Sequence, residues 1–195
     1  MTFSINPGTL VLLIGALGIA TPAAAQEISQ VTLTGVADDQ CVLGQAAAGD
    51  GAIENFDSPT GAVFTITQLT DPTTLTTRAA ELSLALGAMC NSPHRLIVES
   101  QNAGLWRTEA AGVTAGFGSA VPYRLGLGWA GENRNLSAEA ASRQTIEWEL
   151  LIGYPASGDV QLDFMIDAGA TNAGLGAPLL AGSYSDVVTV TVESQ

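Results

Sequence analysis

Lysine is absent from this chain of 195 residues, and its six arginines are outnumbered by 19 aspartates and glutamates, which gives a formal net charge of −13. A surface of that sign repels phosphate backbones and anionic lipid head groups. We therefore expect neither nucleic acid nor an anionic membrane as a partner. We interpret the acidic surface as a solvated coat that keeps the protein in solution.

Histidine occurs once and cysteine twice. A Ser–His–Asp triad would have to use His94, and the sequence contains no Gly-x-Ser-x-Gly elbow. Because His94 follows Pro93 at the start of an expected strand, we interpret it as a surface or turn residue. Two cysteines and one histidine cannot supply four zinc ligands without carboxylates, and no metal-ligand spacing is visible. We expect no enzyme, no metal and no cofactor.

Two other patterns have a chemical and a structural interpretation. Glu147 and Glu149 lie two residues apart on one expected strand, about 7 Å from each other, and carboxylate pairs at such distances can serve glycoside hydrolysis. On an acidic protein we interpret them as the wet face of a sheet. Trp106 and Trp129 are candidates for an exposed sugar-binding platform, but packing in the core is the usual fate of large aromatic side chains.

Long apolar runs are also missing, apart from residues 10–20, which are too few to span a bilayer. Pro22 and three alanines follow this run and form a small-residue cleavage site, although residues 1–8 carry no lysine or arginine. We interpret residues 1–25 as a signal peptide. The mature chain is then exported, first to the periplasm and then to the cell surface, and begins at Gln26.

The two cysteines, Cys41 and Cys90, both lie in the expected mature chain. An even number of cysteines in an exported protein indicates a disulfide bond. Two free buried thiols are the alternative.

Alternating apolar and polar residues predict strands along most of the mature chain. In residues 146–152 the apolar side chains share one face and the glutamates share the other, and residues 160–166 repeat the pattern. Many short strands separated by turns predict an all-β sandwich in one domain. The remaining strands are expected at 63–67, 81–86, 96–98 and 184–192.

Glycine, asparagine, aspartate and proline mark the expected turns between these strands. Such turns are predicted at residues 48–51, 131–135 and 155–159. Residues 136–143 are short and polar, and we interpret them as a loop or a single helical turn. Residues 168–180 predict a long mobile loop.

Four segments give the chain a resemblance to the spore coat protein U domain, the subunit type of archaic chaperone–usher pili. They are an amino-terminal Val-Thr-Leu-Thr-Gly-Val, a Cys-Asn-Ser-Pro-His-Arg-Leu, a Val-Pro-Tyr-Arg-Leu and a closing Ala-Gly-Ser-Tyr-Ser-Asp with a Val/Thr strand after it. These segments occupy residues 31–36, 90–96 with the following strand and turn to 105, 121–125 and 181–186.

The resemblance implies an immunoglobulin-like, pilin-type β-sandwich that lacks one strand and is completed by donor-strand exchange. The missing strand leaves a hydrophobic groove, which a periplasmic chaperone would fill first. The amino-terminal extension of another pilus subunit would then replace the chaperone at the outer-membrane usher. The family places the two cysteines in a bridge between the first two strands.

Mapped onto this chain, the resemblance makes residues 26–35 the donor strand and residues 36–195 the sandwich. Ile28, Val31 and Leu33 are the candidate donor side chains, although Ile28 is out of phase with the other two. The extension before Gly35 is about 30 Å long when fully extended, which is short for a donor and leaves open a terminal, minor or non-polymerising subunit. The sequence does not distinguish a major, minor or tip subunit.

The closing strand would line the groove with Tyr184, Val188, Val190 and Val192, which share one face. The alternative function is a monomeric secreted binding module with a complete sandwich, directed at carbohydrate or a surface.

Overall fold

The computed structural model describes residues 33–57, 62–109 and 114–195, and the chain divides into two units, residues 1–36 and 37–195. The expected signal peptide lies outside the described residues, as do Ile28 and Val31 of the expected donor strand. Residues 33–36 of the first unit form no strand. The described residues include no helix with the length and apolar character needed to cross a membrane.

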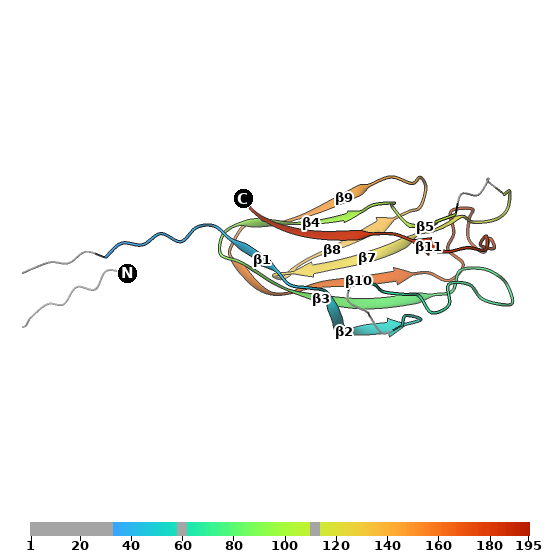
Figure 1. Ribbon diagram of the computed structural model, residues 1–195, viewed down its shortest axis with the longest axis horizontal. Coiled ribbons are helices and arrows are strands. Elements are labelled where there is room, and N and C mark those ends of the chain that lie inside the picture. Colours follow the sequence, from blue (N-terminus) through green and yellow to red (C-terminus); the bar gives the residue numbers. More distant parts are fainter. Residues whose placement is uncertain (1–32, 58–61, 110–113) are drawn as a thin grey trace, which may run out of the picture. The chain divides into compact units, whose positions relative to one another are not determined.

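The second unit is built from strands, and no helix occurs among its described residues (Figure 1). Its largest sheet has the order β1-β3-β10-β7-β8, and β2 pairs with the same edge of β3 as an irregular strand with a register shift between Ala48 and Ile53. All of its pairings are antiparallel. The members are β1 (Cys41–Leu43), β2 (Ala47–Glu54), β3 (Ala80–Cys90), β7 (Tyr123–Trp129), β8 (Glu132–Ala138) and β10 (Ala156–Ile166).

Two smaller sheets have three strands each, with the orders β12-β4-β9 and β11-β5-β6. The chain leaves β3 through Asn91-Ser92-Pro93 to enter β4, so this turn connects the large sheet with the first of the small ones. The members are β4 (His94–Ser100), β5 (Leu105–Arg107), β6 (Ala120–Val121), β9 (Ile146–Ile152), β11 (Tyr184–Ser185) and β12 (Val188–Ser194).

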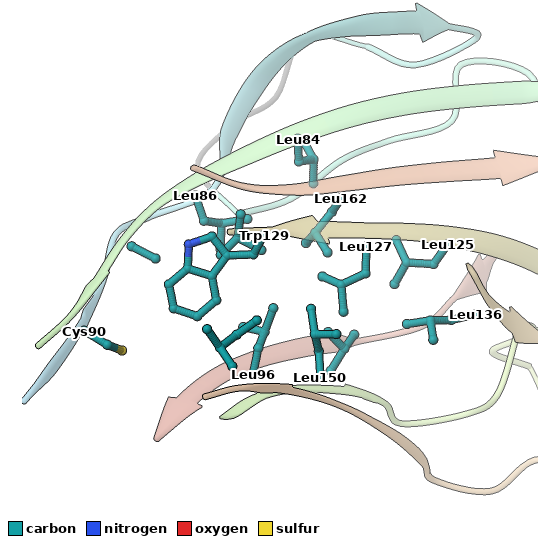
Figure 2. Close-up of a cluster of buried hydrophobic side chains, with 14 of the residues drawn as sticks. Leu84, Leu86, Cys90, Leu96, Leu125, Leu127, Trp129, Leu136, Leu150 and Leu162 are labelled. Atoms are coloured by element: carbon teal, nitrogen blue, oxygen red, sulfur yellow. The ribbon is translucent and has the colours of Figure 1, made fainter. Parts of the chain in front are cut away.

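The main core lies between the large sheet and the β12-β4-β9 sheet. Leu84, Leu127 and Leu162 of the large sheet lie opposite Leu96 and Leu150 of the smaller one (Figure 2). Each of these leucines is buried. The arrangement is that of a two-layer sandwich in which both inner faces carry the apolar half of an alternating pattern.

The expected alternation of buried and exposed side chains is present, and it is clearest in the long strands. In β10, Val160, Leu162 and Ile166 are buried whereas Asp163 is exposed, and β9 shows the expected face shared by Ile146, Trp148, Leu150 and Ile152. The prediction of an all-β fold is therefore confirmed.

Several local predictions were wrong. The segment 48–51 lies within β2 instead of a turn, and 132–138 form β8 instead of a turn followed by a loop. Pairing with β3 and β7 imposes the strand conformation on these polar, glycine-rich sequences. Residues 63–67 form no named strand, and their one pairing to a described partner is the isolated bridge between Phe56 and Ile66.

The segment 168–180, expected to be a mobile loop, is tied to its surroundings by hydrogen bonds. The Thr77 hydroxyl donates to the Ala170 carbonyl at 2.6 Å, and the Gly118 amide donates to the Pro178 carbonyl at 2.8 Å. The side-chain oxygen of Asn172 accepts from the Ala120 amide at 3.0 Å. These bonds satisfy backbone groups that a loop crossing the surface would otherwise leave to water.

Candidate functional site

Strand β12 is the edge of its sheet and pairs on one side with β4. Val190 lies opposite Val98, and the pairing continues to both ends of the two strands. Strand β1, the edge of the large sheet, lies close to β12 without pairing to it (Figure 1). The two sheets therefore approach each other here through edges that share no hydrogen-bond ladder in the described residues.

The hydrogen-bond phase of β12 shows which backbone groups point away from β4. Beyond the ends of the ladder, the Gln101 amide donates to the Val187 carbonyl and the Gln195 amide donates to the Pro93 carbonyl, both at 2.9 Å. In an antiparallel pair the bonded positions alternate, so the odd-numbered residues of β12 bond to β4. The peptide groups of Val188, Val190 and Val192 therefore face the open side.

The same three valines point their side chains toward the main core. Each is half-buried and packs against the main core cluster, whereas Thr189 and Thr191 between them are exposed. Within the part of the chain that the structure describes, this edge thus combines unpaired backbone groups with an apolar lining, which are the two features that an added strand uses.

Tyr184, expected on the same strand, belongs to a different one. It lies in β11, which pairs with β5, and its hydroxyl donates to the Leu180 carbonyl at 2.7 Å. Asp186 and Val187 separate β11 from β12. The closing sequence therefore forms two short strands in two different sheets. Val188, Val190 and Val192 share the face of β12, and Tyr184 does not belong to it.

Asp186 holds the point where these two strands separate. One carboxylate oxygen accepts from the Ser100 hydroxyl at 2.6 Å and from the Tyr123 hydroxyl at 2.7 Å. The other accepts from the amides of Asn102 at 3.0 Å and Val187 at 2.8 Å. The carboxylate thereby joins the end of β4 and the start of β7 to the start of β12.

The environment keeps the phenol of this network protonated. Burial raises the pKa of Tyr123 well above its usual range, and the negative charge of Asp186 raises it further. Tyr123 is therefore held in the protonated form that donates a hydrogen bond to Asp186. Sequence reasoning assigned no role to Asp186, although its position between two strand-like segments was a signal.

The disulfide expected between Cys41 and Cys90 is present. It joins β1 to β3, which are neighbours in the sheet but are separated along the chain by β2, so it does not connect the first two strands. Cys90 is buried and Cys41 is half-buried. The bridge closes a loop with a sequence separation of 49 residues.

His94 lies in the core rather than on the surface, so that interpretation was wrong. It is fully buried with Leu96, Val98 and Ser100 on the inward face of β4. Its Nδ1 lies 2.8 Å from the Ser92 carbonyl and its ring lies 4.4 Å from the ring of Trp129. The alternation of the four inward residues in the sequence was the signal that could have placed it.

The candidate tryptophans and Glu149 contribute to packing and to ion pairs. Trp129 is buried in the core, and Trp106 and Trp148 are half-buried. Glu149 forms an ion pair with Arg95 at 3.3 Å, and Arg95 also pairs with Glu193 at 2.7 Å. These contacts link β4, β9 and β12 across the exposed face of their sheet.

An open hollow of about 440 Å³ lies on the large sheet near the β7–β8 hairpin. Its lining includes Gly126, Gly128, Asn133, Gln161 and Asp163. The amide and carboxylate groups among them offer hydrogen-bond partners to a polar ligand.

Leu33, the candidate donor residue within the described part of the chain, is 90% exposed and belongs to no strand.

No family model matches the chain, and no curated protein or solved structure matches it either.

Proposed function

We propose that this protein is a structural subunit of a surface pilus of the chaperone–usher type. In this proposal the sandwich is immunoglobulin-like and pilin-type, and a strand from another subunit completes it. The open edge of β12 is the observation that carries the proposal, because the outward peptide groups of Val188, Val190 and Val192 coincide with an apolar lining. The sequence resemblance to spore coat protein U domains supports the same function.

The occupant of the edge is residues 26–35 of a second subunit. Val31 and Leu33 alternate in the phase that places both side chains on one face of a strand. Paired with β12, that face covers the apolar lining while the donor backbone satisfies the outward peptide groups. A periplasmic chaperone covers the edge before assembly, and the outer-membrane usher is where the exchange takes place.

Deletion of residues 26–34 tests the donor. The truncated protein is expected to keep its fold, since the sandwich consists of later residues, and to stop polymer growth. Co-expression with the neighbouring genes, followed by electron microscopy and non-boiled gel electrophoresis, measures polymer length. Polymers of normal length from the truncated protein would refute the assignment of the donor.

A pair of proline substitutions tests the acceptor edge. Val190→Pro removes an outward N–H that the folded subunit does not use, whereas Thr191→Pro removes an N–H bonded to β4. Edge strands tolerate proline where the N–H faces solvent. We expect Val190→Pro to keep the monomer folded and to abolish polymers, while Thr191→Pro lowers the stability of the monomer. Normal polymerisation of Val190→Pro would exclude β12 as the acceptor.

The hollow near the β7–β8 hairpin favours a second candidate, a monomeric secreted module that binds carbohydrate or a surface. This function predicts a stable monomer without any partner, and retention on a glycan array that Gln161→Ala reduces. Polymers that depend on residues 26–34, together with no glycan retention, would exclude it.

A further inference from the structure

Cys41, Cys90 and His94 lie together at one end of the sandwich. The two sulfurs and a ring nitrogen of His94 are all within 4.8 Å of one another, and no other group of three such ligands occurs in the described residues. In the oxidised protein the sulfurs are bonded to each other. The cluster therefore has a second chemical state, in which the bond is reduced and three ligand atoms face one another.

The histidine has the features of a metal ligand. Its Nδ1 lies 2.8 Å from the Ser92 carbonyl, which can only accept, so Nδ1 carries the proton and Nε2 keeps its lone pair. Nε2 is buried and has no hydrogen-bond partner among the described residues. A ring N–H bonded to a backbone carbonyl is the usual way in which proteins orient a metal-binding histidine.

The backbone keeps the two cysteines opposite each other independently of the sulfur–sulfur bond. The Asn91 amide donates to the Gln40 carbonyl at 3.1 Å, and the Asn91 side chain accepts from the Gln40 amide at 2.7 Å and donates to the Asp38 carbonyl at 2.8 Å. Reduction therefore leaves Cys41 beside Cys90. Rotation about the Cα–Cβ bonds can then bring the sulfurs to the separation of about 3.8 Å that two thiolates take on a tetrahedral zinc ion.

We propose that the reduced protein binds a soft, thiolate-preferring metal ion of the Zn²⁺ or Cu⁺ class through Cys41, Cys90 and His94. Three protein ligands leave one coordination position for water, and Cys41 is half-buried, so this ligand is partly accessible to solvent. The site and the disulfide exclude each other, so a bound metal ion prevents oxidation of the thiols. The proposal is independent of polymer assembly.

A phosphine serves as the reductant of the disulfide bond. Cleavage of the sulfur–sulfur bond takes up two electrons and two protons and yields two thiols, while phosphorus is oxidised to the phosphine oxide with oxygen from water. Metal binding then releases both thiol protons, because the thiolate is the ligand.

Cobalt(II) titration of the phosphine-reduced full-length protein tests the site. We expect thiolate-to-cobalt charge transfer and the visible bands of tetrahedral coordination, both removed by Zn²⁺, with one ion per chain. His94→Phe keeps an aromatic ring beside Trp129 but cannot bind metal. It should weaken cobalt binding by more than about 100-fold, since mutations around metal ligands alone reduce affinity by about 10–100-fold.

A second measurement follows reoxidation by glutathione disulfide. Zn²⁺ should slow disulfide formation in the wild-type protein and have little effect on His94→Phe, with circular dichroism confirming that both reduced proteins are folded. Three results would overturn the proposal: cobalt binding no tighter in the reduced than in the oxidised protein, equal binding by His94→Phe, or unfolding on reduction that Zn²⁺ does not reverse.

Discussion

At the scale of single residues, the carboxylate of Asp186 has the largest set of partners. Ser100 and Tyr123, both buried, donate their hydroxyl protons to it, and Asn102 donates from its backbone and its side chain. Hydrogen bonds to a charged acceptor are stronger than those between neutral groups. The hydrogen bonds of this one carboxylate therefore hold the start of β12 in place against β4 and β7.

Asp186→Ala should lower the free energy of unfolding by about 2–4 kcal/mol, because two buried hydroxyls lose their acceptor. Urea denaturation followed by tryptophan fluorescence measures the change. The matched control is Asp167→Ala, which removes an exposed ion pair with Arg124 and should change stability by less than about 1 kcal/mol. Equal effects of the two substitutions would contradict the role assigned to Asp186.

Tyr123 gives the protein an alkaline limit of stability. Burial and the charge of Asp186 raise the pKa of its phenol in the folded state, so above about pH 10 the unfolded chain loses a proton that the folded protein retains. The stabilising contribution is complete below pH 10 and is lost as the pH rises. Tyr123→Phe should flatten this decline by up to about 1.4 kcal/mol per pH unit, as measured by urea denaturation between pH 8 and pH 11. An unchanged slope would contradict it.

At the scale of strands, the sequence pattern predicted the strands that bury one apolar face and failed at the polar, glycine-rich ones. Strands β3, β9 and β10 are buried on one face and read as regular alternation. Strands β2 and β8 are edge strands whose Gly, Asn and Asp residues resemble turns, and their conformation comes from pairing with distant segments. A local pattern contains no information on such pairing.

The candidate site shows the same division. The shared face of Val188, Val190 and Val192 was predictable from period-2 alternation. The break at Asp186 depends on which strands meet in three dimensions. The burial of His94 follows the alternation that it shares with Leu96 and Val98. Proline before His94 suggested a turn, but the turn ends at Pro93 and the strand begins at the next residue.

The β7–β8 hairpin has a two-residue turn whose first position, Ala130, has a backbone conformation that disfavours alanine. Ala130 and Gly131 both have positive φ, 53° and 85°, as a type I′ turn requires. Alanine is strained there, and asparagine is the preferred first residue. Ala130→Asn should stabilise the protein by about 0.5–1 kcal/mol, whereas Gly131→Val should destabilise it. Thermal unfolding measures both, and a loss of stability in Ala130→Asn would contradict the turn assignment.

At the scale of the whole molecule, the sandwich is held by contacts between segments far apart in the sequence. Strand β12 pairs with β4, and β1 is fastened to β3 by the disulfide. Such pairings must close long loops before they gain stability, which slows folding relative to helical proteins. A crosslink that shortens one of these loops in the unfolded chain stabilises the folded state.

Replacement of both cysteines by serine should lower the free energy of unfolding by about 2–4 kcal/mol, given the 49-residue separation. Guanidinium denaturation measures the change, with the phosphine-reduced wild-type protein as the control. The two should agree, and a double-serine variant as stable as the oxidised protein would contradict a stabilising role for the bridge.

The free edge of β12 lacks the features that usually protect sheet edges from other chains. Natural sheets protect such margins with lysine, proline or a bulge, yet Val187-Val188-Thr189-Val190-Thr191-Val192 contains no charge and no proline. Short segments of this composition stack into cross-β fibrils. Protein in which this edge stays unpaired should therefore convert to thioflavin-binding amyloid with the spacing of about 4.7 Å between stacked strands, and the same six residues as a free peptide should seed the conversion.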